Sequence, residues 1–343
     1  MRLLRGNPNS SPPGGVLRAT ALSAIVAASL LTSCSLAGCG AGAAIRQALG
    51  MDGEYLLYGF DAITEPGRPA NVRVRLQKGS FLNDQEGRLI ELYRDDELVS
   101  LARTDDEGIA HMTFTPPEVG DYRLDIRVLG QLGENGPGPA DVLVACRRSD
   151  EPICVVDIDR TLVTSPFSHV LSGDAQPMRE SVRVMHRLAE EYTIIYLTLR
   201  LDYFGPTTKS WLEEYDYPTG PLWVSQFRGL LAGNRDFRTE QVRRLRRQFP
   251  RARLGIGDKI SDAEAYLTNE MTAILIVRPE TMDEADDCRK LADALEHLPA
   301  CTTHVVRGWR EVERIVFHAE AFPPGRVAED LRRRAEELHR PQR

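Results

Sequence analysis

The sequence predicts a small all-β domain followed by an α/β domain built on a parallel sheet. Its 343 residues exceed the length of one ordinary domain. Residues 54–147 alternate apolar and polar side chains over short runs that turn residues separate. After residue 150, short apolar runs alternate with segments of helical periodicity, and this rhythm is typical of a parallel sheet with helices on both faces.

Residues 1–39 have the pattern of a targeting segment, in which arginines precede an apolar stretch at 19–31. That stretch is too short to span a bilayer comfortably. Cys34 and Cys39 follow in small-residue contexts that resemble the lipobox of bacterial lipoproteins, and the Leu-Ala-Gly before Cys39 is the better match. We expect a lipid-anchored, extracytoplasmic protein of the cell envelope. An uncleaved anchor, or a secreted or periplasmic protein released by an ordinary signal peptidase, is the alternative.

Residues 40–53 are rich in Gly and Ala and form a linker. In the domain at 54–147, three stretches alternate most clearly, at 72–76, 110–114 and 122–128. Short strands at this spacing, without helical patterns, are typical of an immunoglobulin-like sandwich. We see no cluster of catalytic residue types here, so a spacer or adaptor role is expected.

The α/β domain is expected at 150–320, with a charged helix or tail at 321–343. That tail is either a solvated surface helix or a contact for anionic lipid headgroups. A capping-box sequence at 261–264 opens one of the helices. In chain order we predict a strand at 154–158, a helix at 177–190, strands at 192–199 and 221–225, a helix at 240–249, and strands at 253–257 and 272–277.

Chemistry-bearing residues follow three of these strands. Asp157, Thr198 and Asp258 fall at or just past strand ends, where ligands bind in such sheets. In an extended segment every second side chain points the same way, so Asp157 and Asp159 address one small volume. Two carboxylates that close repel each other unless a cation or a phosphate-binding site lies beside them.

The segment 157–161 reads Asp-Ile-Asp-Arg-Thr and resembles the D-x-D-x-T signature of the haloacid dehalogenase-like superfamily. The resemblance implies a Mg²⁺-dependent phosphohydrolase in which Asp157 is the nucleophile and Asp159 the general acid and base. It implies metal ligands from Asp157, the backbone carbonyl of Asp159 and Asp258, with Asp262 as a ligand through water or a supporting group. It also implies that Thr161, which closes the loop, contacts the phosphate.

The later motifs of that superfamily also find matches. Thr198 stands where a Ser or Thr is expected to donate to a phosphoryl oxygen, and Arg200 is able to hold phosphate bidentately. The third motif expects a lysine. Arg238 stands in its place, with Lys259 and Lys209 as alternatives.

Details of these motifs resemble the lipin-type phosphatidate phosphatases, whose first motif reads Asp-Ile-Asp-Gly-Thr. Arg160 replaces that glycine. The gap between Thr161 and Thr198 holds one helix and a loop, which leaves no room for a large cap domain. A capless, open site suits bulky or membrane-embedded substrates, so phosphatidate or a related lipid phosphate is the expected substrate.

Two other functions stay open. One is a phosphatidate- or phosphate-binding module without turnover, and the other is a phosphatase for soluble or protein phosphoesters. The net charge of −7 argues against a nucleic-acid partner. We expect a phosphorylated substrate and, through the N-terminal anchor, a membrane surface as the partners.

Overall fold

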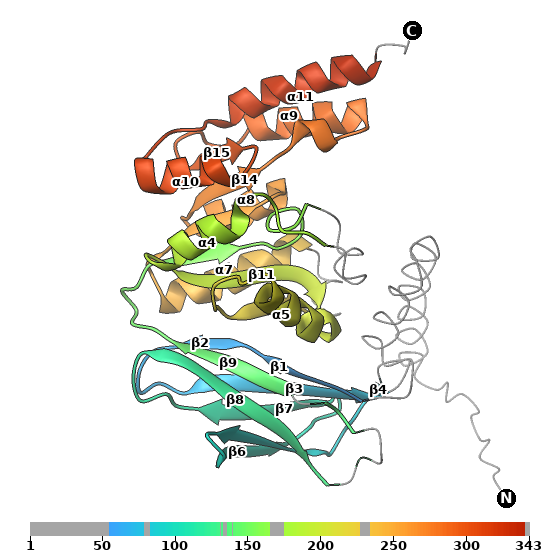
Figure 1. Cartoon of the computed structure of the whole chain (residues 1–343), viewed down its shortest axis with the longest axis vertical. Helices are drawn as coiled ribbons and strands as arrows, with labels where there is room; N and C mark the ends of the chain where they lie inside the picture. Colours follow the sequence, from blue (N-terminus) through green and yellow to red (C-terminus); the bar gives the residue numbers. More distant parts are fainter. Residues whose placement is uncertain are drawn as a thin grey trace, which may run out of the picture.

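The computed structural model describes residues 55–78, 83–130, 132, 136–138, 140–164, 175–226 and 234–339. Within them an antiparallel β region is followed by an α/β region, which lies above it in Figure 1. The predicted targeting segment and linker, with Cys34 and Cys39, lie outside the described residues. In the part of the chain that is described, no helix is long and apolar enough to cross a membrane.

The β region contains two sheets that share one apolar core. In the first, β3 pairs antiparallel with β1, β4 and β7. The second runs β2-β9-β8-β5-β6 and is antiparallel except between β2 and β9. The strands are β1 (Tyr55–Phe60), β2 (Ala62–Thr64), β3 (Ala70–Lys78), β4 (Asn83–Asp84), β5 (Leu89–Arg94), β6 (Glu97–Arg103), β7 (Ile109–Phe114), β8 (Gly120–Leu129) and β9 (Ala140–Cys146). The predicted alternating strands are confirmed, and an immunoglobulin-like topology stays a prediction.

The α/β region is built on a six-stranded sheet in the order β12-β11-β10-β13-β14-β15, and every pair in it is parallel. This confirms the parallel sheet expected from the sequence. Its strands are β10 (Ile153–Val156), β11 (Thr193–Leu201), β12 (Leu222–Ser225), β13 (Ala252–Gly257), β14 (Thr272–Ile276) and β15 (Thr303–Val306). Because β10 and β13 are neighbours at the centre, the residues that follow them meet at one edge.

Helices cover both faces of this sheet because successive strand residues point to opposite sides. Val156 and Ile256 belong to the core on one face, and Val155 and Leu275 belong to the core on the other. The first face packs against α4 (Ser181–Ala189), α5 (Gly205–Glu214) and α10 (Trp309–His318). The second packs against α7 (Asn234–Gln248), α8 (Ile260–Thr268), α9 (Ala285–Glu296) and α11 (Pro324–His339). Two short 3₁₀ helices, η1 (Asp202–Phe204) and η2 (Pro279–Thr281), complete the fold.

Two elements differ in detail from the sequence pattern. The helix expected to open with the box at 261–264 begins one residue earlier, at Ile260, so Ser261 lies inside it. The charged C-terminal helix α11 buries Val327, Ala328 and Leu331 against the sheet, and its arginines are half-buried or exposed. It is therefore part of the α/β core as well as of the charged surface.

Candidate active site

The loop after β10 turns tightly around Ile158. The backbone N–H groups of Thr161 and Leu162 both donate to the Ile158 carbonyl, at 3.2 and 2.8 Å. Arg160, at the position where the lipin-type motif has glycine, adopts φ +60°. This left-handed conformation costs a non-glycine residue roughly 1–2 kcal/mol. The loop therefore requires a left-handed backbone conformation at position 160, which glycine adopts without this cost. Arg160 adopts the same conformation, and its side chain is exposed.

Asp157 is buried at the start of this loop, with 1% of the residue exposed. Its backbone N–H donates to the Ile256 carbonyl of β13 at 2.9 Å, which places it directly opposite the loop that follows β13. Burial raises the pKa of the Asp157 carboxyl, and the Arg238 guanidinium opposes that rise.

The loop after β13 supplies two more carboxylates. Asp258 follows the strand, and Asp262 lies in the first turn of α8. The Oδ2 of Asp262 accepts the backbone N–H groups of Asp258 and Lys259, both at 3.1 Å. A side chain at Gly257 would overlap the Asp262 carboxylate, so this close approach requires glycine. Asp262 thus orders this loop from the first turn of α8.

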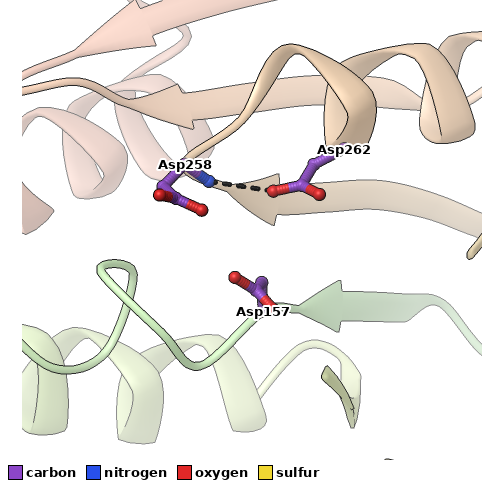
Figure 2. A group of neighbouring side chains, drawn as sticks. All are labelled: Asp157, Asp258 and Asp262. Carbon is purple, nitrogen blue, oxygen red and sulfur yellow. Dashed lines mark hydrogen bonds between the residues drawn. The ribbon is translucent and has the colours of Figure 1, made fainter. Parts of the chain in front are cut away.

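Asp157, Asp258 and Asp262 converge, as Figure 2 shows, with ligand oxygens within 4.8 Å of one another. Asp157 Oδ2 and Asp258 Oδ1 are buried and have no hydrogen-bond partner among the described residues. Burial and the neighbouring Asp157 raise the pKa of Asp258 to about 7. Unpartnered, buried carboxylate oxygens aimed at one point are what a hard divalent cation requires, so these residues fit a metal ion.

Arg238 of α7 places a positive charge among these carboxylates. Its side chain is 1% exposed, and its Nη2 donates to Asp157 Oδ1 at 2.8 Å. Its Nη1 forms an ion pair with Asp262. The arginine at the expected lysine position thus reaches the site and links the carboxylates that follow β10 and β13.

The two alternative lysines differ in where they lie. Lys259 is exposed at the start of α8, beside Asp258, and its backbone N–H is bound by Asp262. The Nζ of Lys209 donates to Asp61 of the β region at 2.7 Å. Lys209 is therefore committed to the contact between the two regions and does not face the carboxylates.

The carboxylate of Asp159 is paired with Arg200, whereas that of Asp157 is paired with Arg238. Arg200 donates to both carboxylate oxygens of Asp159, from Nε at 3.0 Å and from Nη2 at 2.8 Å. The Arg200 side chain is 1% exposed, and its Nη1 also donates to Thr208 of α5 at 3.0 Å. The carboxylate of Asp159 thus lies beside the three converging carboxylates and outside their cluster. Arg200, expected to hold phosphate, holds this carboxylate in the structure.

The two predicted threonines are both fully buried. The hydroxyl of Thr198 accepts the backbone N–H of Arg200 at 3.3 Å, so it helps to shape the end of β11. Thr161 Oγ1 has no hydrogen-bond partner among the described residues. A buried hydroxyl at the carboxylate cluster is free to donate to an anionic ligand.

Sequence reasoning missed the residues that support the catalytic loop from outside. The indole of Trp309, at the start of α10, donates to the Thr161 carbonyl at 2.8 Å. Arg278 donates from Nη2 to the Thr164 carbonyl at 2.9 Å. Neither residue belongs to a local motif, and no signal in the sequence connects positions this far apart.

Comparison with known proteins supports the predicted relation for one stretch of the chain. Residues 154–273 match the family model described as PITM 1-3, LNS2 domain. The matched stretch runs from β10 into β14 and contains Asp157, Thr198, Arg238 and Asp258. This supports a relation of the α/β region to the lipin-type, haloacid dehalogenase-like phosphatase domains, which use a divalent metal. No curated protein matches the chain.

Similarities to solved structures are remote. A glycosyl hydrolase family 2 member from Bacteroides cellulosilyticus is 12% identical over 74% of this chain and 35% of its own, with a TM-score of 0.24. A β-glucuronidase 2 from Bacteroides uniformis is 13% identical over 67% and 34%, with a TM-score of 0.25. The chain spans only about a third of either structure, and similarities this low carry no argument about fold or function.

Proposed function

We propose that this protein is a Mg²⁺-dependent phosphomonoester hydrolase that forms an aspartyl-phosphate at Asp157, and that its substrate is phosphatidate or a related lipid phosphate. The observation that carries the proposal is the cluster of the buried Asp157 and Asp262 with the half-buried Asp258, which contains buried oxygens without a partner among the described residues. The match of residues 154–273 to the LNS2 model agrees with it.

The chemistry assigns a role to each residue at the site. Asp157, Asp258 and Asp262, with the Asp159 carbonyl, would hold Mg²⁺, which would offset the charge of the phosphoryl group. One Asp157 oxygen attacks phosphorus, the bond to the departing alkoxide breaks, and Asp159 gives that alkoxide a proton. Water then cleaves the aspartyl-phosphate while Asp159 takes up the proton. Arg238 holds Asp157 in place and balances its charge.

Binding of the phosphate group falls to the side chains that line the loop. Thr161 offers its buried hydroxyl, and Thr198 and Arg200 stand at the end of β11 on the same edge. The exposed cations Arg160 and Lys259 flank the two loops and attract an anionic substrate.

The lipid substrate and the location belong to the same proposal. We infer that the chain is anchored in the cell envelope through Cys39 or Cys34, facing a membrane outside the cytoplasm. A capless site would then be presented to lipid headgroups. The lipobox-like sequences and the single helix, α4, among the described residues between Thr161 and Thr198 support this inference.

A second candidate function is a phosphatidate- or phosphate-binding module without turnover. The bidentate contact between Arg200 and Asp159 favours it, because both oxygens of that carboxylate already have a partner in the structure. Retention of Asp159 favours the enzyme, because binding alone needs no leaving-group acid. A substrate panel separates the two functions. Phosphate release from vesicle-embedded phosphatidate supports the lipid phosphatase. Release only from soluble esters supports a phosphatase for soluble or protein phosphoesters. Phosphatidate binding without any release supports the binding module.

The decisive variant is Asp157→Asn. We expect phosphate release in Mg²⁺ to fall to background, because an amide oxygen is a far weaker nucleophile than a carboxylate. The circular dichroism spectrum should keep its native shape. The matched control is Asp150→Asn, whose side chain is 67% exposed, and it should keep wild-type turnover. Wild-type-like release by Asp157→Asn would rule out Asp157 as the nucleophile.

A further inference from the structure

The β region contacts the segment of the α/β region that follows Arg200. Arg75 of β3 forms an ion pair with Asp202, the first residue of η1. Both side chains are largely buried, at 12% and 4% exposed. The other Asp202 oxygen accepts the backbone N–H of Tyr203 at 3.0 Å, which ties the ion pair to the path of the main chain.

Two further contacts press α5 against the β region. Gly205, at the start of α5, lies against the ring of Tyr58, and a side chain at Gly205 would overlap that ring. One turn further along α5, Lys209 donates to Asp61 at 2.7 Å. The segment from η1 into α5 therefore contacts the β region at Asp202, Gly205 and Lys209.

The same segment determines where Asp159 lies. The pairing of β11 with β12 shifts register between Leu197 and Leu201, so regular strand pairing does not fix Arg200. Instead Arg200 donates to Thr208 Oγ1, and this hydroxyl donates to the Phe204 carbonyl at 2.8 Å. Arg200 in turn holds both oxygens of Asp159. Side-chain contacts, linked through the main chain of η1, thus join Arg75 to Asp159.

We propose that Arg75 of the β region is a positioning residue for Asp159. It fixes η1 and α5, which orient Arg200 through Thr208 and so determine where the Asp159 carboxylate stands. The β region is then a working part of the active site, in contrast to the spacer or adaptor that its sequence suggests. This inference rests on the proposed function, because it assigns Asp159 the proton that the leaving group receives.

The experiment compares two esters that differ in their need for that proton. An alkyl phosphate expels an alkoxide, which requires a general acid, whereas p-nitrophenyl phosphate expels a stable phenolate, which does not. General acid catalysis contributes typically 10²–10⁴-fold. Partial misplacement of Asp159 in Arg75→Ala should therefore lower kcat/KM for the alkyl ester about tenfold, and that for p-nitrophenyl phosphate less than about twofold. The ratio of the two values is independent of the fraction of protein that is folded.

Two variants probe the same ion pair from either side, and a third is the control. Asp202→Asn should show the selective loss, and Arg75→Lys should recover part of it by restoring the charge. Arg123→Ala removes an exposed ion pair between the same two regions, with Glu213 of α5 at 3.0 Å, and should leave the ratio unchanged. Equal losses on both esters in Arg75→Ala and Asp202→Asn would overturn the inference and leave the proposed function standing. If the wild type releases phosphate from no ester, vesicle-embedded phosphatidate included, both fail.

Discussion

Charge balance at Arg238 illustrates how single residues shape the site. Asp157, Asp258 and Asp262 bring three carboxylates together, and Arg238 offsets one of them. The two charges that remain are those that one divalent cation would neutralise. The ammonium group of a lysine would concentrate the charge at one atom, whereas the planar guanidinium of Arg238 contacts two carboxylates at once. The substitution at this position therefore keeps the charge and adds a link between the loops.

Gly257 matters to the site because its missing side chain leaves room for the Asp262 carboxylate. We expect Gly257→Ala to displace the Asp262 carboxylate that its new methyl group would meet, and to weaken Mg²⁺ binding about 10–100-fold. Titration calorimetry with MgCl₂ measures the affinity. Gly325→Ala, where nothing lies within 4 Å of the added carbon, is the control and should bind like the wild type. Unchanged Mg²⁺ affinity in Gly257→Ala would show that Asp262 takes no part in the metal site.

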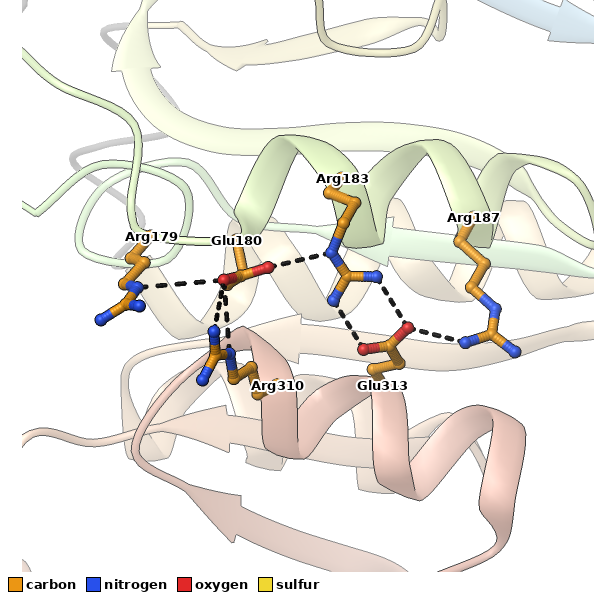
Figure 3. Close-up of polar contacts among 6 residues, drawn as sticks. All are labelled: Arg179, Glu180, Arg183, Arg187, Arg310 and Glu313. Carbon is orange, nitrogen blue, oxygen red and sulfur yellow. Dashed lines mark hydrogen bonds and ion pairs between the residues drawn. The ribbon is translucent and has the colours of Figure 1, made fainter.

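At the scale of elements, α10 supports the catalytic loop and is itself held by α4. Figure 3 shows two glutamates between the helices, each surrounded by arginines. Glu313 accepts both terminal nitrogens of Arg183, at 2.8 and 2.6 Å, and Nη1 of Arg187 at 2.6 Å. Because Trp309 of α10 binds the Thr161 carbonyl, this network stabilises the position of the loop that carries Asp157.

The network predicts how stability depends on pH. Hydrogen bonds from Arg183 and Arg187 lower the pKa of Glu313 from 4.5 to about 2. A carboxyl whose pKa is lower in the folded state stabilises the protein above its ordinary pKa and loses that contribution as the pH falls through the folded value. Urea unfolding should show Glu313→Gln less stable than the wild type by about 1 kcal/mol at pH 7, a modest figure because both arginines of the network are partly exposed.

This difference should shrink between pH 4.5 and pH 2, where Glu313 of the wild type takes up its proton. Glu336→Gln, on the exposed side of α11, should match the wild type throughout. A difference between Glu313→Gln and wild type that stays constant down to pH 2 would mean that the ion pairs contribute nothing to stability.

At the scale of the whole molecule, the two regions share buried polar contacts as well as apolar ones. Tyr58 and Phe60 of β1 belong to the core on the first face of the parallel sheet. Asp61 follows them and accepts hydrogen bonds from Leu143 N at 2.9 Å in the β region, and from Leu222 N at 2.9 Å and Lys209 Nζ in the α/β region. One carboxylate therefore joins β9, β12 and α5.

Removing that carboxylate tests whether the two regions unfold as one unit. Asp61→Ala leaves the Lys209 ammonium and the backbone N–H groups of Leu143 and Leu222 without their acceptor. Loss of one partner of a buried ion pair costs about 3–5 kcal/mol. We expect one cooperative transition in calorimetry of the wild type and two separated transitions in Asp61→Ala. Asp150→Ala is the exposed control, with one transition. A single, unshifted transition in Asp61→Ala would show that this contact does not couple the regions.

The sequence was most informative where a pattern is local. Alternation along β3 and apolar runs such as β10 predicted strands because burial acts on side chains at fixed spacing. The order of the motifs also led to Arg238, which the structure places against Asp157. Arg200 was assigned to the phosphate, whereas in the structure it holds Asp159. The sequence places both residues in one site but does not say which groups they contact.

Sequence alone determined the parallel sheet and the strand ends at which Asp157 and Asp258 stand, because hydrophobic periodicity and parallel pairing are sufficient for both. Only the tertiary structure decided that Arg200 holds Asp159, that Trp309 supports the catalytic loop, and that Arg75 reaches Asp202 from the β region. These contacts join residues far apart along the chain, and their geometry depends on how whole elements pack, which no local pattern encodes.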